Sequence, residues 1–262
     1  MRLSVCHDTH FQYEEAVRAS IQYVRLTPRS SARQRVLDWQ LDLPAPARVS
    51  QDPYGNILHV LTLDTPHDHI DILANGRVDI DRDVEVERDE GSPLPYLRYT
   101  DLTRPDEALS AFARAQSGRP VERTALIRLM EALHDVMVDE PFREPLPAGV
   151  SFQAGRGGSA DHTHLFLACA RSLGVPARFV SGYLYTEGRE GLASHTWAEA
   201  WLKDGWYTFD VTERLTRPER HLKLAVGLDH LDACPVRGVR RGGGLEQMKA
   251  NVRVLAQQLR QQ

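Results

Sequence analysis

The chain has 262 residues, 42% hydrophobic and 26% charged, which is long enough for one large domain or two ordinary ones. Lys plus Arg number 32 and Asp plus Glu 36, a near balance that gives no reason to expect a nucleic-acid or membrane partner. The three cysteines, Cys6, Cys169 and Cys234, are far apart and predict no disulfide framework. With no apolar signal segment and no run near about 18 apolar residues, we expect a cytoplasmic protein.

Residues 1–83 are predicted to form an antiparallel β-sandwich domain. Apolar and polar residues alternate over 37–43, which indicates a strand with one wet face. Val17, Ala19, Ile21 and Tyr23 alternate in the same way, and a bulge is expected just beyond them, where the apolar phase slips. Several short strands without an intervening helix favour a small sandwich.

A charged segment with several Gly and Pro residues, 84–100, is predicted to link this domain to a core domain over 101–262. Helices are expected over 105–116, 121–138 and 159–173, and the last is apolar enough to be buried. Strands are expected over 177–185, 195–202, 206–209 and 222–226, with a last alternating run at 248–254. The predicted fold class is α+β.

Three polar residues stand beside this apolar framework in settings that suit catalysis. Ser159 opens the buried helix after a glycine loop, His195 opens a strand, and Asp210 ends the next strand. A helix N-terminus offers free N–H groups and a partial positive charge, which favour a thiolate nucleophile and an oxyanion. Taken singly, each residue is as well explained as a helix cap, a buried histidine or a turn residue.

Four sequence words in order resemble the bacterial transglutaminase-like superfamily. They are GRGGSADHTHLF at 155–166, SLGVPARFVSGY at 172–183, SHTWAEA at 194–200 and GWYTFD at 205–210. The tail 221–244 is similar to the same family, so the resemblance covers roughly residues 100–255. The strand-rich first domain looks like the β-sandwich that precedes this core in many bacterial members.

The resemblance implies a papain-like core with a Cys-His-Asp triad. The family histidine falls on His195, the family aspartate on Asp210, and the family cysteine on Ser159. Three neighbouring positions, Ala160, Val211 and Leu228, also depart from the family pattern. The resemblance therefore implies the scaffold of an acyl-transfer enzyme whose nucleophile has been replaced.

This replacement predicts little or no acyl transfer. A thiol near pKa 8.5 is readily deprotonated by an imidazole, whereas a serine hydroxyl must lose its proton during attack. The serine is either natural or a substitution made by experiment, and the drift at the three neighbouring positions favours the natural origin. The non-enzymatic alternative is a pseudoenzyme that binds a peptide or protein in the old cleft.

Other catalytic classes fit the sequence less well. His162 and His164 cannot chelate one ion from a helix, because residues two apart point to nearly opposite sides. An α/β-hydrolase elbow would need a second glycine after Ser159, and the order Ser, His, Asp is wrong for that fold. A true Ser-His-Asp site on the papain-like scaffold is a third alternative.

The substrate expected from the resemblance is an amide bond of a peptide or protein, without a cofactor or metal. Hydrolysis and transfer to an amine both remain open, as does the oligomeric state. Trp197 and Trp206 flank the triad in sequence and are predicted either to pack in the core or to line the cleft, together with Asp161 and His162.

Overall fold

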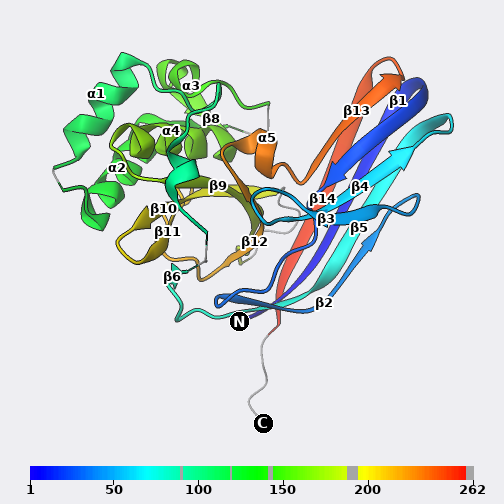
Figure 1. Ribbon diagram of the computed structural model, residues 1–262, viewed down its shortest axis with the longest axis horizontal. Helices are drawn as coiled ribbons and strands as arrows, with labels where there is room; N and C mark the ends of the chain where they lie inside the picture. Colours follow the sequence, from blue (N-terminus) through cyan, green and yellow to red (C-terminus); the bar gives the residue numbers. More distant parts are fainter. Residues whose placement is uncertain (89–90, 119, 141–143, 188–193, 258–262) are drawn as a thin grey trace, which may run out of the picture.

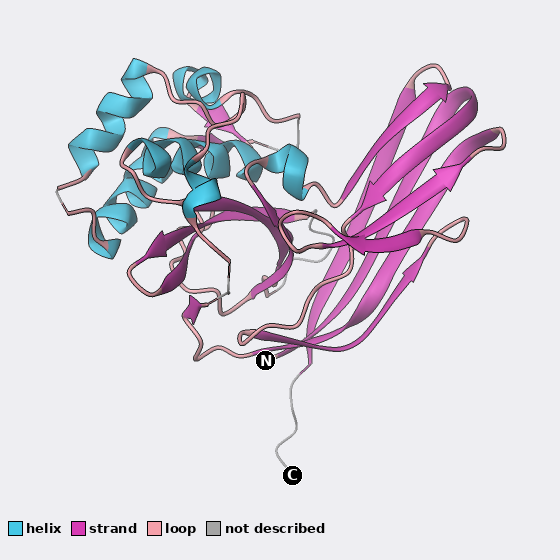
Figure 2. Ribbon diagram, viewed as in Figure 1, coloured by secondary structure: helices cyan, strands magenta, loops and turns pink. Residues whose placement is uncertain are grey.

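The computed structural model describes residues 1–262 except 89–90, 119, 141–143, 188–193 and 258–262. Long strands form one part of the molecule, and helices packed on a curved sheet form the other (Figure 1). Helices and strands are largely segregated, as Figure 2 shows by colour. The α+β prediction is thereby confirmed.

The first domain is a seven-stranded antiparallel sheet around the long strand β1 (Arg2–Val24). One edge of β1 pairs with β4 and β5, and its other edge pairs with β13 and β14. Of the remaining strands, β2 pairs with β5 and β3 pairs with β4. The bounds are β2 (Gln34–Asp42), β3 (Arg48–Gln51), β4 (Ile57–Leu63), β5 (His67–Ile80), β13 (Val236–Gly242) and β14 (Glu246–Gln257).

The sheet folds back on itself near residues 12–17 of β1. The register between β1 and β5 shifts between Gln12 and Val17, and Glu15 N donates to Gly243 O at 3.1 Å at the same level. Figure 1 shows β13 running toward this bend and β14 running back from it. Gly243 has a φ of 98°, a backbone conformation that favours glycine. The predicted sandwich is therefore one antiparallel sheet folded into two layers.

The second half of β1 buries a different face from the one predicted. Ser20, Gln22 and Val24 are buried, whereas Tyr23 is 36% exposed. The bulge lies earlier than expected, at the register shift between Val17 and Ala19 with β13. A slip of one residue moves every following side chain to the other face.

The second sheet has the order β12-β9-β10-β11-β6, and α4 (Ser159–Ser172) packs on it. Helix α4 is buried along nearly its whole length and contacts each of α1, α2 and α3. Within the described part of the chain, no helix is both long and apolar enough to cross a bilayer. The bounds are β6 (Val86–Glu87), η1 (Leu94–Leu97), α1 (Glu107–Gln116), α2 (Arg123–Val136), β7 (Val138–Asp139), α3 (Ala148–Ala154), β8 (Arg156–Gly157), β9 (Ala177–Leu184), β10 (His195–Leu202), β11 (Gly205–Phe209), β12 (His221–Gly227) and α5 (His230–Ala233).

The domain boundaries differ from the prediction at two places. Residues 236–257, assigned to the core over 101–262, form β13 and β14 and pair with β1 over nearly its full length. The predicted linker 84–100 contributes β6, which pairs with β11 in the core sheet. The chain returns to the first domain because β1 would otherwise leave a long unpaired edge.

Candidate active site

The start of α4 is fixed by a buried carboxylate. Asp161 Oδ2 accepts from Gly158 N at 3.1 Å, and Oδ1 accepts from Leu146 N at 2.9 Å and Ser151 Oγ at 2.8 Å. A Cβ at Gly157 would lie 2.5 Å from Asp161 Cβ, so only glycine fits there. Asp161 therefore holds the glycine loop in place. The prediction that it lines a cleft is wrong.

Ser159 is the first residue of α4 and is half-buried. The first backbone hydrogen bond of this helix runs from His162 N to Gly158 O, so the preceding N–H groups have no partner within the helix. Thr163 Oγ1 donates to Ser159 O at 2.7 Å and lies 3.3 Å from Thr196 Oγ1. The first turn of α4 is thus tied to the residue beside His195.

His195 and Asp210 form a close pair. His195 Nε2, at the start of β10, lies 2.7 Å from Oδ2 of Asp210, the residue directly after the neighbouring strand β11. Asp210 is fully buried, and Glu213 N donates to its Oδ1 at 3.1 Å. The His195 side chain is 12% exposed, so one end of the imidazole can be reached while the carboxylate is shielded.

A third residue, His221, joins this pair. Its Nε2 lies 2.9 Å from the same oxygen, Asp210 Oδ2, and its side chain is fully buried at the start of β12. In the sequence, His221 stands out only as the beginning of a family-like tail. It lies 11 residues from Asp210, but no local pattern shows that the chain between them returns to this carboxylate. The one available signal was a histidine opening a strand, as at His195.

The two histidines differ in charge. Burial alone would lower the pKa of His195, but the charge and hydrogen bond of Asp210 outweigh it and raise this pKa above its usual value. Burial lowers the pKa of His221 although Asp210 opposes the shift. Burial alone would raise the pKa of Asp210, yet the two histidines hold this pKa well below its usual range. The surroundings therefore favour the charged form of His195, the ionised form of Asp210 and the neutral form of His221.

The Asp210 contact leaves His195 Nδ1 for a reaction partner. The hydrogen bond that occupies Nε2 sets the orientation of the ring, as it does for the catalytic histidines of known enzymes. The predicted approach of Ser159 Oγ to this nitrogen stays a prediction. Thr163 bonds to Ser159 O and contacts Thr196, so the first turn of α4 lies near the residue that follows His195 in β10.

His195, Asp210 and His221 are close enough together to consider a metal ion. Both imidazole nitrogens, however, lie within 2.9 Å of one carboxylate oxygen. Ligands around zinc, each about 2.0–2.2 Å from the ion, stand more than about 3 Å apart. The observed distances are those of direct hydrogen bonds between the imidazoles and the carboxylate, so this arrangement suits proton transfer.

The two tryptophans do not line an open cleft. Trp197 is fully buried, stacks on His195 at 6.2 Å between ring centroids and meets the His221 ring edge-on at 4.7 Å. Trp206 is buried under Tyr96 and below the Arg178 guanidinium, 4.1 Å from its ring centroid. The core-packing alternative is correct for both, and Trp197 also shields the histidine cluster.

His162 likewise turns inward. Its Nδ1 lies 3.0 Å from Thr212 Oγ1, in the turn that follows Asp210, and the residue is 2% exposed. The other histidine of this helix turn, His164, accepts from His230 N at 3.0 Å. The two rings contact different elements, as their spacing predicted. His162 ties α4 to the Asp210 turn instead of lining a cleft.

Comparison with known proteins agrees with this geometry. Residues 3–79 match the bacterial transglutaminase-like N-terminal region, and residues 110–211 match the transglutaminase-like superfamily. The second match includes Ser159, His195 and Asp210.

Two relatives and a solved structure are similar to this chain over most of its length. Uncharacterized protein ML0607 of Mycobacterium leprae is 28% identical, covering 97% of this chain and 98% of the relative. Uncharacterized protein Rv2569c of Mycobacterium tuberculosis is also 28% identical, covering 91% and 87%. The crystal structure of a "putative cysteine protease" from Cytophaga hutchinsonii has a TM-score of 0.78 at 19% identity, covering 99% and 92%, which shows a shared fold. With both of its parts matched in this way, the chain belongs to the transglutaminase-like superfamily.

Proposed function

We propose that the protein carries an acyl-transfer site of the cysteine peptidase and transglutaminase type, which acts on amide bonds of peptides or proteins. Ser159 at the nucleophile position leaves this site inactive or nearly so. The observation that carries the proposal is the His195–Asp210 pair, bonded at 2.7 Å and tied through Thr163 to the first turn of α4.

The chemistry follows from the position of each group. A cysteine at position 159 would lose its proton to His195 and attack the amide carbonyl carbon, forming a C–S bond. The carbonyl oxygen would take up the negative charge beside the N-terminal end of α4, where a helix directs its first N–H groups outward. His195 would then return the proton to the leaving amine as the C–N bond breaks, while Asp210 holds the imidazolium.

Serine weakens this sequence at its first step. Its hydroxyl is far less acidic than a thiol, so no stable ion pair with His195 forms before attack. A shorter side chain also places the oxygen wrongly in a site shaped for sulfur, and an error of about 1 Å costs on the order of a hundredfold. This residue favours the second candidate function, a pseudoenzyme that binds a peptide or protein segment without cleaving it.

The test is the reactivity of the Ser159→Cys protein. We expect this thiol to react with iodoacetamide at pH 6, because the α4 N-terminus and His195 both stabilise a thiolate. The exposed thiol of Cys6 supplies an internal reference, whereas Cys169 is buried, and burial raises its pKa. Peptide mass spectrometry would give the alkylation rate at each cysteine.

The matched control is the Ser159→Cys, His195→Ala double variant, which should lose reactivity at pH 6 because the imidazolium partner is gone. The parent should have no fast-reacting thiol. If Cys at position 159 alkylates no faster than Cys6 at pH 6, the acyl-transfer proposal fails and the binding function is favoured.

A further inference from the structure

Strand β12 carries His221 and lies at the edge of the core sheet, yet side chains of the first domain bond its outer backbone. Gln34 donates to Lys223 O at 2.8 Å and accepts from Lys223 N at 2.9 Å. Asn56 does the same at Val226, donating to its O at 2.7 Å and accepting from its N at 2.8 Å. These side chains take the place of a neighbouring strand.

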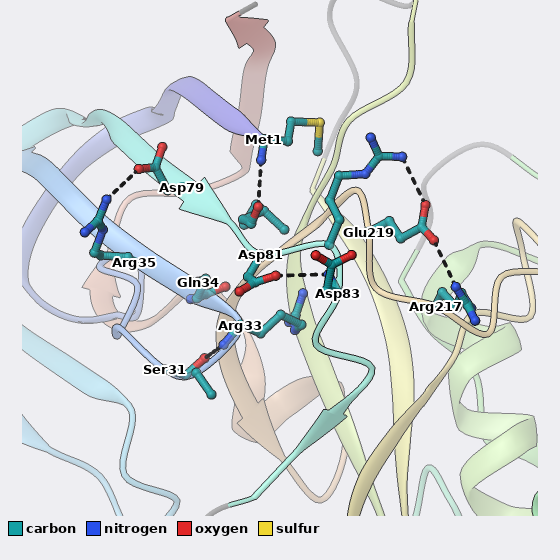
Figure 3. Close-up of a pocket in the computed structure, with 13 residues that line it drawn as sticks. Met1, Ser31, Arg33, Gln34, Arg35, Asp79, Asp81, Asp83, Arg217 and Glu219 are labelled. Atoms are coloured by element: carbon teal, nitrogen blue, oxygen red, sulfur yellow. Dashed lines mark hydrogen bonds and ion pairs between the residues drawn. The ribbon is translucent and has the colours of Figure 1, made fainter. Parts of the chain in front are cut away.

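Arg33 makes the bond nearest to the histidine cluster. Its Nη1 donates to His221 O at 2.9 Å and to Pro218 O at 3.1 Å. Arg33 is 2% exposed although it lies at a cavity of about 780 Å³ between the two domains (Figure 3). Other arginines around this cavity pair with carboxylates, such as Arg35 with Asp79 at 3.0 Å. Nη1 of Arg33 instead donates to the backbone of the segment that leads into β12, whereas its Nη2 is buried without a hydrogen-bond partner among the described residues.

His221 itself donates to the triad carboxylate. Its Nδ1 is buried without a hydrogen-bond partner among the described residues. A proton on Nδ1 would therefore have no acceptor, and a bare Nε2 would face the carboxylate oxygen lone pair to lone pair. The favoured form is a neutral imidazole with its proton on Nε2, donated to Asp210 Oδ2 over 2.9 Å.

We propose that His221 is a positioning residue for the His195–Asp210 pair, and that the first domain holds it in place through Arg33. The two domains then form one active site. This inference rests on the proposed function only in giving His195 the role of base and acid.

Sharing the carboxylate has a defined electrostatic consequence. A neutral donor stabilises Asp210 most when the pair carries a net negative charge, that is, when His195 is neutral. His221 therefore limits how far Asp210 favours the His195 imidazolium and keeps His195 able to release its proton near neutral pH. The other charged groups acting on the two histidines are Asp139, Glu213 and Arg33.

The test is the NMR titration of His195 in the parent protein and in variants of His221. In His221→Leu, we expect the titration midpoint of His195 to rise by about one pH unit, since one donor to the carboxylate is lost. His221→Gln keeps an N–H near the position of Nε2 and should titrate within about 0.3 units of the parent. Should His221→Leu not fold, His221→Asn, whose shorter amide cannot reach Asp210, carries the same prediction.

Arg33→Met tests the part played by the first domain, with Arg35→Met as the matched control. The Arg35 side chain is 73% exposed and bonds only to Asp79 among the described residues. We expect Arg33→Met to shift the His195 midpoint upward and Arg35→Met to leave it unchanged.

An unchanged midpoint in folded His221→Leu or His221→Asn would overturn the role of His221. Equal midpoints in the two arginine variants would overturn the role of the first domain. These titrations use the protein with Ser159 in place, so they can succeed or fail independently of the alkylation test of the proposed function.

Discussion

Two buried histidines in this molecule, His7 and His195, have pKa values shifted in opposite directions. At the domain interface, His7 Nδ1 lies 2.6 Å from Tyr183 Oη, and His7 Nε2 lies 2.9 Å from Thr9 Oγ1. Burial lowers the pKa of His7 to about 4, since neither neighbour carries a charge. In the core sheet, Asp210 raises the pKa of the buried His195 above its usual value.

The comparison teaches that the charge of the partner, more than burial, decides what a buried histidine can do. His7 stays neutral, joins β1 to β9 and stabilises the interface. Asp210 favours the charged form of His195, which lies next to Thr196, the residue that contacts Thr163 of the largely buried α4. A change that removes the charge of Asp210 should make His195 resemble His7.

The largest effect is expected from Asp210→Asn in the Ser159→Cys protein. An amide cannot stabilise the imidazolium, so the pKa of His195 should fall below its usual value and the thiolate should lose its partner. We expect the alkylation rate at pH 6 to drop by up to about two orders of magnitude, because an ordinary thiol of pKa near 8.5 is almost wholly protonated at that pH; the rate is measured at position 159. A drop of less than about tenfold would mean that the carboxylate does not set the state of His195.

The next effect concerns the stability of the His7 cluster at acid pH. Unfolded His7 binds a proton below about pH 6.5, whereas folded His7 resists protonation down to about pH 4. The unfolded chain thus binds more protons in this window, so stability is full above pH 6.5 and falls as the pH drops. The contribution lost by pH 4 is about 3 kcal/mol.

Denaturant unfolding at pH 7 and pH 4 would measure this loss in the parent and in His7→Gln. We expect the variant to have a flatter pH dependence by about 3 kcal/mol. Identical pH dependence in the parent and His7→Gln would refute the buried neutral histidine.

A smaller effect should come from Asp161, a buried carboxylate that accepts from two backbone N–H groups and the Ser151 hydroxyl. Asp161→Asn weakens the bonds that hold the glycine loop, with an expected loss of about 2 kcal/mol in unfolding free energy. Because Asp161 lies outside the His195–Asp210 pair, the His195 titration should stay as in the parent. A shifted His195 midpoint would show that the loop and the pair are coupled.

The sequence predicted the active-site elements well because their signals are local. Helix α4 begins at Ser159 and β10 at His195, both as expected, because a glycine loop and an alternating strand mark these points. Asp210 likewise lies directly after β11. The prediction that His195 and Asp210 meet came from the family resemblance, and the structure brings them to 2.7 Å.

Contacts between distant segments were missed. Nothing local in 236–257 shows that it pairs with β1, since alternation is the same in any sheet. The buried face of β1 was misassigned because Ser20 and Gln22 are polar, and Ser20 finds a partner only in His67, at 3.1 Å. His221 was also missed, because no local pattern shows that the chain between Asp210 and β12 folds back to this carboxylate.

The central claim is that position 159 and His195 Nδ1 face each other across the start of α4. A crystal structure of the Ser159→Cys protein after iodoacetamide treatment tests it most directly. We predict that Sγ lies within about 4 Å of His195 Nδ1, with the added carboxamide beside the first N–H groups of α4. A separation above about 8 Å, with α4 and β10 both ordered, is too long for proton transfer even through one water and would contradict the account.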